Sequence, residues 1–331
     1  MPPDETGPNV SLCVPLYRSD PRHLASLVAS FAEQGYRDLE VVLVDDATPG
    51  LDAGALEAMV APLRERFPGG RIVAAQNATN LGMVGNWNRA VESGSGELVM
   101  CVSQDDELGA GMLAAYVAEF EADPDVVLVS GAEQFIDDSG RPLDRKLKVG
   151  HRHNVFVRHD RYVLDHDEMV RLSLRNGQGF GEPSAVMFRR SVFDAVGGYD
   201  PLFEHAADVD FNLRASALGR SVYLRHPYLR RRWHSGGLTR SNLGSGAVAR
   251  DRLRLYERYR QTVGLTEADR AEARSALASH SLYDALRAAR ARQWAVARLA
   301  LDNLRVGARA PLRVHAAHIA EIVRHRNRDE R

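Results

Sequence analysis

The first 131 residues alternate short apolar runs with amphipathic segments, and this order constrains the fold more than any other feature of the sequence. Each apolar run is short and continuous, which indicates a strand buried on both faces. The segments between the runs carry apolar residues at helical spacing. Such an order predicts an α/β fold in which a mostly parallel sheet is covered by helices on both faces. The predicted strands span residues 10–17, 39–46, 71–77, 97–103 and 125–131.

The remaining sequence divides into an irregular stretch, a second ordered stretch and a helical end. From residue 137 to residue 178 the pattern dissolves into a polar segment rich in histidine. Order returns in residues 182–200 with a strand, a short helix and a Gly-Gly stop. Residues 245–331 are rich in Ala, Leu and Arg with a helical period, so we expect a helical C-terminal appendage. The expected domains are therefore 1–244 and 245–331.

Cysteine usage and the lack of apolar spans favour a cytoplasmic protein. Cys13 and Cys101 both lie within apolar runs, which favours buried free thiols in a reducing compartment. Two cysteines on separate strands are too few for a zinc site. We find no basic segment followed by an apolar stretch at the N-terminus, and no run of the ~18 apolar residues that a membrane span requires.

The net charge of −1 conceals a basic C-terminal region. Residues 245–331 hold 18 arginines against 10 acidic residues, which leaves the preceding 244 residues with a net charge of −9. Arginine makes up 41 of the 43 basic residues, a bias typical of GC-rich codon usage, so single arginines carry little weight. The C-terminal helices can pack on the rest of the chain, mediate a homodimer, or contact the inner face of an anionic membrane. Nucleic acid is not an expected partner, because no recognised motif accompanies the charge.

Two pairs of adjacent aspartates follow predicted strands, at the point where each strand ends. Asp45-Asp46 follows the second strand, and Asp105-Asp106 follows the fourth. Ligands of open α/β sheets bind at the carboxyl ends of the strands, and Mg²⁺ and Mn²⁺ prefer oxygen ligands. A single pair is equally well explained by a solvated turn or a helix cap, since Asp favours both. Two pairs at one edge favour a site where a divalent cation bridges carboxylate and nucleotide diphosphate.

The same edge lacks the glycine-rich loops that cradle phosphate in other nucleotide-binding proteins. The first strand ends in VPLYRSDP, without a G-x-G-x-x-G, and no G-x-x-x-x-G-K-[ST] occurs in the chain. This absence argues against a nicotinamide enzyme and a P-loop enzyme, and it disfavours a sugar nucleotidyltransferase. A receiver-like signalling domain would need an acidic pair after the first strand and a lysine after the fifth, and the sequence has neither.

Three stretches, taken in order, resemble glycosyltransferase family 2. They are VSLCVPLYRSDPRHLASLVASFAEQGYRDLEVVLVDDAT, NLGMVGNWNRAVESGSGELVMCVSQDDEL and EPSAVMFRRSVFDAVGGYDPLFEHAADVDFNLRASALG, and the resemblance covers roughly residues 9–240. It implies a GT-A fold, which is Rossmann-like, with a nucleotide-sugar-binding half over 9–131 and an acceptor and catalytic half over 132–244.

The activity that the resemblance implies is that of an inverting, hexosyltransferase-type enzyme. Such an enzyme moves a sugar from a nucleotide-diphosphate donor, with UDP-sugars favoured, to a hydroxyl-bearing acceptor with the help of Mn²⁺ or Mg²⁺. The acceptor would be a glycan, a lipid-linked sugar or a small molecule, and the product a cell-surface polysaccharide, a glycolipid or a glycosylated metabolite.

By resemblance, the donor site lies at the carboxyl ends of the first, second and fourth strands. Asp46, or its neighbour Asp45, would hydrogen-bond the base, which in UDP-sugar members is uracil. Ser103-Gln104-Asp105 occupies the D-x-D position of the family, with serine in place of the first aspartate. Asp105 is then the carboxylate that holds the metal, and His234, from a segment that closes over the diphosphate, would ligate the metal or bind phosphate. The remaining implied donor-binding residues are Pro15, Tyr17, Asn80, Ser103, Gln104 and Asp106.

The inverting reaction requires a general base that takes a proton from the acceptor hydroxyl. The resemblance assigns this role to Asp208, at the start of a helix after the GGYD turn, with Ala207 in place of the glutamate that precedes the base in the family. Asp208 and Asp210 lie about 200° apart on a helix, so both cannot face one site. Capping of this helix is the alternative role of Asp208. The other implied residues are Glu182 and Trp233 at the acceptor and Arg230, Arg231 and Arg232 near the phosphates.

Two departures from the family pattern leave a second hypothesis open. Ser103 and Ala207 stand where the family has acidic residues, so a catalytically impaired, glycosyltransferase-like binding subunit is the alternative. The histidines of the irregular stretch fit no compact zinc pattern, which favours a solvated loop on the acceptor side. Acceptor choice is expected to reside in residues 137–182, with the C-terminal tail as a second candidate region, and no transferable sequence code exists for either.

Overall fold

The computed structural model describes residues 9–36, 38–66, 71–143, 156, 158–176, 180–233 and 244–307. Its internal contacts divide the chain into two compact units. The sheet unit comprises Met1–Leu164, Gly181–Pro201 and Arg214–His234, and the helical unit comprises Asp165–Phe180, Leu202–Leu213 and Ser235–Arg331.

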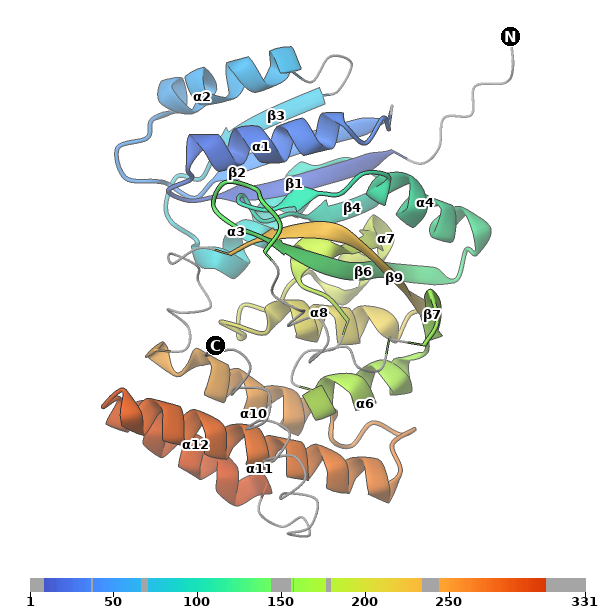
Figure 1. The fold of residues 1–331 in the computed structure, drawn as a ribbon, viewed down its shortest axis with the longest axis vertical. Coiled ribbons are helices and arrows are strands. Elements are labelled where there is room, and N and C mark those ends of the chain that lie inside the picture. The colour runs from blue at the N-terminus through green and yellow to red at the C-terminus, as the bar shows by residue number, and fades with distance from the viewer. Residues whose placement is uncertain are drawn as a thin grey trace. The chain divides into compact units, whose positions relative to one another are not determined.

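The N-terminal half of the sheet contains the four parallel strands that the sequence predicts. β1 (Val10–Leu16) lies between β2 (Leu39–Asp45) and β4 (Leu98–Cys101), and β3 (Arg71–Gln76) lies beyond β2. β1 and β2 are buried along nearly their whole length, as continuous apolar runs require, whereas β3 at the edge of the sheet is half-buried. Successive strands are joined by α1 (Pro21–Ala32), α2 (Ala53–Arg66) and α3 (Gly82–Ser93) (Figure 1).

Alternate residues of the strands form the main core. Leu12 and Val14 of β1 pack in one cluster with Leu27 of α1, Val60 of α2 and Tyr116 of α4 (Met112–Ala122). Burying each large apolar side chain contributes roughly 1.5–3 kcal/mol. Helix α3 contacts β1, β2 and β4 and covers the other face, so helices cover both faces of the sheet, as predicted.

The two cysteines are buried free thiols, in agreement with the sequence. Cys13 on β1 is the register partner of Cys101 on β4. Burial raises the pKa of the Cys13 thiol to about 12, so this thiol is unreactive at neutral pH.

The second half of the sheet is mixed rather than parallel. The predicted fifth strand is β6 (Val126–Ile136), which is separated from β4 by β8 (Val186–Arg189), antiparallel to both. β9 (Arg220–Arg232) runs parallel to β6, side by side with it in Figure 1, and pairs antiparallel with β5 (Glu107–Leu108) and β7 (Arg161–Leu164). Apolar periodicity identifies strands but not their partners, because pairing across long sequence separations leaves no local pattern. Two short helices flank β8, η1 (Pro183–Ala185) and α7 (Arg190–Val196).

The helical unit contains the C-terminal helices together with two earlier segments. α10 (Ala247–Tyr259), α11 (Glu267–Arg290) and α12 (Trp294–Gly307) confirm the helical period of this region. α6 (His166–Asn176) packs on α10 and α11. The part of α8 (Ala207–Ser216) up to Leu213 belongs to the same unit. Within the described ranges, every helix is too short or too polar to cross a membrane.

Candidate functional site

The carboxyl ends of β1, β2 and β4 meet at one edge of the sheet, and side chains tie their loops together. Gln104, after β4, accepts hydrogen bonds from Tyr17 N at 2.9 Å and Ser19 Oγ at 2.6 Å, and its Nε2 donates to Tyr17 O at 3.1 Å. Arg18 N donates to Thr48 Oγ1 at 2.9 Å, which links the loop after β1 to the loop after β2. These contacts join the first-strand loop to the predicted D-x-D position.

Backbone strain is concentrated in the same loops. Arg18 has a φ of 49° and Ala47 a φ of 53°, both in the left-handed region that residues with a Cβ rarely adopt. Each such residue costs on the order of 1–3 kcal/mol and persists only where surrounding contacts hold it, commonly at ligand-binding sites. Pro15, half-buried at the end of β1, leads into this strained turn, and Tyr17 beside it is 40% exposed.

The buried carboxylates of Asp45 and Asp46 hold the loops at this edge of the sheet. Asp45 is fully buried, and its carboxylate accepts hydrogen bonds from Thr48 N at 2.9 Å, Thr48 Oγ1 at 2.7 Å and Gln76 Nε2 at 3.0 Å. Asp46 is also buried and accepts from Leu81 N and Gly82 N, at 2.8 and 2.9 Å, which stabilises the start of α3. The structure therefore gives both carboxylates a scaffolding role.

Asn80 lies on the surface of the same loop. Its side chain donates from Nδ2 to the backbone oxygen of Asp46 at 2.9 Å and accepts at Oδ1 from Gly82 N at 3.1 Å. The residue itself is exposed. This predicted donor-binding residue is thus held beside Asp46 and faces solvent.

The Asp105-Asp106 pair divides into a half-buried and a buried carboxylate. Asp106 is buried, accepts from Ser184 Oγ at 2.6 Å and Arg232 N at 3.1 Å, and thereby joins the fourth-strand loop to η1 and β9. Burial, and secondarily the charge of Asp105, raises the pKa of Asp106 to about 7. Asp105 is half-buried, and its backbone oxygen accepts from Arg232 Nε at 2.8 Å. Of the two carboxylates, Asp105 is the one accessible to a ligand. Ser103 N donates to Ser184 Oγ at 2.9 Å.

The arginines at the end of β9 are paired with carboxylates of the sheet unit. Arg230 and Arg232 both form ion pairs with Glu107. Arg231 lies 2.9 Å from the predicted acceptor residue Glu182 and 3.3 Å from Glu133. The structure thus uses as internal counter-charges the three arginines that the resemblance places near the phosphates.

Trp233, the other predicted acceptor residue, follows directly and is 43% exposed. Its ring packs edge-on against Phe135, with 6.0 Å between ring centroids. The predicted metal ligand His234 lies outside the described residues.

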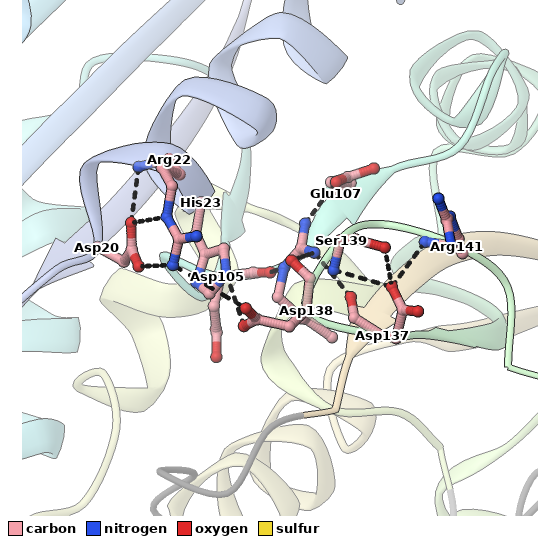
Figure 2. A network of polar contacts seen from close by, with 10 residues as sticks. Asp20, Arg22, His23, Asp105, Glu107, Asp137, Asp138, Ser139 and Arg141 are labelled. Atoms are coloured by element: carbon pink, nitrogen blue, oxygen red, sulfur yellow. Dashed lines mark hydrogen bonds and ion pairs between the residues drawn. The ribbon is translucent and has the colours of Figure 1, made fainter.

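A polar network that the sequence did not reveal includes the backbone of Asp105 (Figure 2). Arg232 donates from Nη1 to the backbone oxygens of Asp137 and Asp138, at 2.8 and 3.0 Å. The carboxylate of Asp138 lies 3.1 Å from His23 Nε2 at the start of α1 and 3.9 Å from Arg22. Arg232 therefore links the backbone of Asp105 to the turn after β6, and Asp138 links that turn to α1.

The predicted base lies on α8, in the part that belongs to the helical unit. α8 begins at Ala207, so Asp208 is the second helical residue and is not the N-cap, and it is buried. Asp210 is fully buried and bonds to α10, with Arg258 Nη1 at 2.7 Å and Tyr259 Oη at 2.9 Å from its Oδ1. Because side chains two residues apart point to opposite sides of a helix, Asp208 faces away from Asp210 and its partners.

Helix α10 also holds the turn that precedes α8. Asp251 of α10 accepts from His205 N at 2.6 Å and Ala206 N at 3.1 Å, so it supplies the cap that Ala206 lacks a side chain to provide. Arg250 pairs with Glu204 at 2.8 Å, and the Arg258 guanidinium lies 4.9 Å from the centre of the Phe203 ring. The sequence could not reveal these contacts, since about 45 residues separate the partners.

The residues at the sheet edge fit a divalent cation that arrives with a diphosphate. Mg²⁺ and Mn²⁺ in such sites take one or two carboxylates together with substrate phosphates, and Asp105 offers one accessible carboxylate beside a second acid. Burial is the main cause of the raised pKa of Asp106 and the charge of Asp105 is the second; a cation between the two carboxylates would reduce this second contribution. Among the described residues, no cluster of three acidic, histidine or cysteine side chains forms a complete metal site by itself.

Comparison with known proteins agrees with this geometry. Residues 11–197, more than half of the chain, match the family model described as Glycosyl transferase family 2. An uncharacterized protein of Mycobacterium tuberculosis is 28% identical over 254 residues, which cover 75% of this chain and 74% of that protein. The uncharacterized glycosyltransferase YwdF of Bacillus subtilis is 25% identical over 207 residues, 62% of this chain and 68% of its own length.

Two solved structures share the fold at low identity. The mannosyltransferase PcManGT from Pyrobaculum calidifontis, in complex with GDP-Man and Mn²⁺, has a TM-score of 0.58 at 18% identity and covers 96% of this chain and 79% of its own. S. aureus TarS 1–349 in complex with UDP-GlcNAc has a TM-score of 0.55 at 17% identity, with 90% and 92% of the two chains covered. These likenesses show that the sheet and its helices form a GT-A fold.

Proposed function

The chain belongs to glycosyltransferase family 2, and from this premise we propose that it is an inverting, metal-dependent enzyme that moves a hexose from a nucleotide-diphosphate donor to a hydroxyl acceptor. The observation that carries the proposal is the accessible carboxylate of Asp105 at the carboxyl edge of the sheet. Its loop is tied by Gln104 to the strained turn after β1. This is the edge at which open α/β sheets bind nucleotides.

Tyr17, Asn80 and Asp105 are the donor-binding residues that the geometry supports most directly. Tyr17 and Asn80 are exposed at the ends of β1 and β3, where a base and ribose can contact them. Asp46, whose Oδ2 accepts from Gly82 N, retains a lone pair for a base N–H. We favour a UDP-sugar donor because of the resemblance, and the TarS structure contains UDP-GlcNAc. The mannosyltransferase structure contains GDP-Man, so GDP-sugars are the second choice.

In the proposed reaction, Asp208 accepts the proton of the acceptor hydroxyl as its oxygen attacks the anomeric carbon. The bond between that carbon and the diphosphate oxygen breaks on the opposite side, which inverts the configuration. A divalent cation bound by Asp105, with His234 as a second ligand, would neutralise the charge on the departing diphosphate. Asp251 and Asp210 hold the helix that carries Asp208, and Glu182 and Trp233 are proposed to line the acceptor side.

A catalytically impaired binding subunit is the second candidate, because Ser103 and Ala207 replace acidic residues of the family pattern. A cytoplasmic site of action agrees with the two reduced, buried thiols. The expected homodimer and the acceptor class, whether glycan, lipid-linked sugar or small molecule, stay predictions.

The experiment is a thermal-shift screen of UDP-, GDP- and dTDP-sugars with and without Mn²⁺, followed by a transfer assay on the best donor. We expect one nucleotide to raise the melting temperature only when Mn²⁺ is present. Asp208→Asn should retain this shift and lose at least a hundredfold in turnover, as removal of a general base does. Unchanged turnover would eliminate Asp208 as the base. Donor binding without turnover in the wild type would favour the binding subunit.

A further inference from the structure

The hairpin of α11 and α12 exposes apolar side chains near its turn. Leu286 on α11 is 54% exposed, and Trp294 and Leu301 on α12 are 67% and 46% exposed. The helices pack on each other and lie side by side in Figure 1, joined only by residues 291–293. Leu286 and Trp294 therefore lie at the same end of the hairpin. Tryptophan is highly buried on average, so a Trp with two thirds of its surface in water is informative.

Arginines accompany these apolar side chains in the sequence. Between Asp284 and Asp302 the sequence has four arginines and no acidic residue. Asp284 itself is buried and paired with Arg252 of α10, so its charge is already compensated inside the unit. The four are Arg287, Arg290, Arg292 and Arg298, of which the last three are exposed.

Spacing places the key residues of α12 on one stripe. Trp294, Arg298 and Leu301 recur at four and three residues, which puts them on one side of the helix. Val296 and Ala297 face inward and belong to the core of the hairpin. Together, Leu286, Trp294, Leu301 and the four arginines form what we call the hairpin-tip surface.

We propose that the hairpin-tip surface docks the chain on a membrane that carries anionic lipids. An amphipathic Trp ring prefers the headgroup level, and leucine side chains reach the acyl boundary. Arginine guanidinium groups pair with lipid phosphates, and each basic residue near an anionic surface contributes about a fivefold gain in binding, equivalent to roughly 1 kcal/mol. The proposal does not involve the donor-site residues, so it is independent of the proposed transfer reaction.

A second copy of the chain is a poorer occupant of this surface. A two-fold symmetric contact would bring the same patch of each copy together and would set four arginines against four. Cores of protein interfaces are depleted of charge, and the exposed acid nearest to these arginines in the sequence, Asp302, is already paired with Arg305. An anionic lipid surface satisfies both the charge and the apolar side chains.

The test is co-sedimentation of the full chain with vesicles, without any nucleotide sugar. We expect binding to vesicles of phosphatidylcholine with half phosphatidylglycerol, no binding to pure phosphatidylcholine, and loss of binding at high salt. The triple variant Arg290→Gln, Arg292→Gln, Arg298→Gln should bind roughly a hundredfold more weakly, at about fivefold per arginine. Lipids brominated on the acyl chain should quench tryptophan fluorescence in the wild type, and Trp294→Phe should lose the quenching.

The matched control removes three charges elsewhere. Arg64, Arg71 and Arg225 of the sheet unit have side chains 40%, 70% and 50% exposed, and their triple Gln variant should bind the anionic vesicles like the wild type. Circular dichroism verifies that each variant is folded.

Three results would overturn the proposal: equal vesicle binding by the two triple variants, no binding to anionic vesicles, or a dimer in sedimentation velocity that Trp294→Ser dissociates. Tighter retention of an oligonucleotide than of vesicles, through the same arginines, would assign the surface to nucleic acid instead. Each of these outcomes leaves the donor-site experiments unaffected.

Discussion

Arg258 of α10 holds the helix of the proposed base through a buried ion pair, and Arg258→Met tests this role. Its partner Asp210 is fully buried, at 2.7 Å from Arg258 Nη1, while the Arg258 side chain is 34% exposed and also covers the Phe203 ring. Removing one partner of a buried pair costs about 3–5 kcal/mol, because the remaining charge stays buried. Since Arg258 is partly exposed, we expect the lower end, about 3 kcal/mol.

Urea unfolding of Arg258→Met measures this loss, and a transfer assay measures its effect on turnover. The methionine keeps most of the apolar stem, so the change isolates the charge. If the pair positions α8, turnover should fall while the affinity for the donor nucleotide is retained. Asp210→Asn combined with Arg258→Met should recover part of the stability, because the buried charge is then absent.

Arg260, two residues after Arg258, provides the matched control. It follows α10, and its side chain is 38% exposed and pairs with Glu257 at 2.7 Å. An exposed pair of this kind is worth well under 1 kcal/mol, so Arg260→Met should leave stability nearly unchanged. Equal and small effects of the two substitutions would refute the reasoning.

Three further predictions concern the sheet unit and the α8 cap. Asp106 has a pKa raised from 3.8 to about 7 by burial and by Asp105, so its contribution to stability is full below pH 3.8 and is lost as the pH rises through about 7. The free energy of unfolding of Asp106→Asn, measured with urea, should therefore rise by a few kcal/mol relative to that of the wild type as the pH increases from about 4 to about 8. If the difference between the two free energies is the same at every pH, the burial of the Asp106 charge is contradicted. Gln104→Ala removes three hydrogen bonds between two loops, which together contribute about 1.5–4.5 kcal/mol, and should weaken donor binding at least tenfold in a calorimetric titration. Asp251→Ala uncaps the turn before α8 and should cost about 1–2 kcal/mol of stability, with lower turnover; Asp251→Asn, which keeps an acceptor oxygen, should recover most of it.

Much of the fold is predictable from the sequence because its signals are local. The strands expected over 10–17, 39–46 and 71–77 end within one residue of β1, β2 and β3, since each is a single apolar run between turn residues. The insertion of β8 between β4 and β6 is not predictable in this way. Its pairing joins residues about 90 positions apart, and no local periodicity encodes it.

The site likewise has a part that local sequence signals predict and a part that they do not. The edge with Asp45-Asp46 and Asp105-Asp106 follows from where the strands end, and the resemblance supplied the roles. The sequence could not distinguish the acids that scaffold from the acid that is accessible, because the distinction depends on distant partners such as Arg232, 126 residues from Asp106. Asp138 and His23 escaped notice for the same reason: each is an ordinary polar residue until the fold brings them together at 3.1 Å.

The most direct test of the central claim is a calorimetric titration of the donor nucleotide diphosphate into the wild type and into Asp105→Asn, with Mn²⁺ and with a chelator. The control is Asp160→Asn, an exposed carboxylate of the sheet unit that pairs with Arg225. We predict that the wild type and the control bind the nucleotide at least tenfold more tightly with Mn²⁺, and that Asp105→Asn loses this gain while keeping the weak binding seen with chelator. Equal Mn²⁺-dependent affinity in Asp105→Asn and the wild type would contradict the assignment of the cation and the donor diphosphate to Asp105.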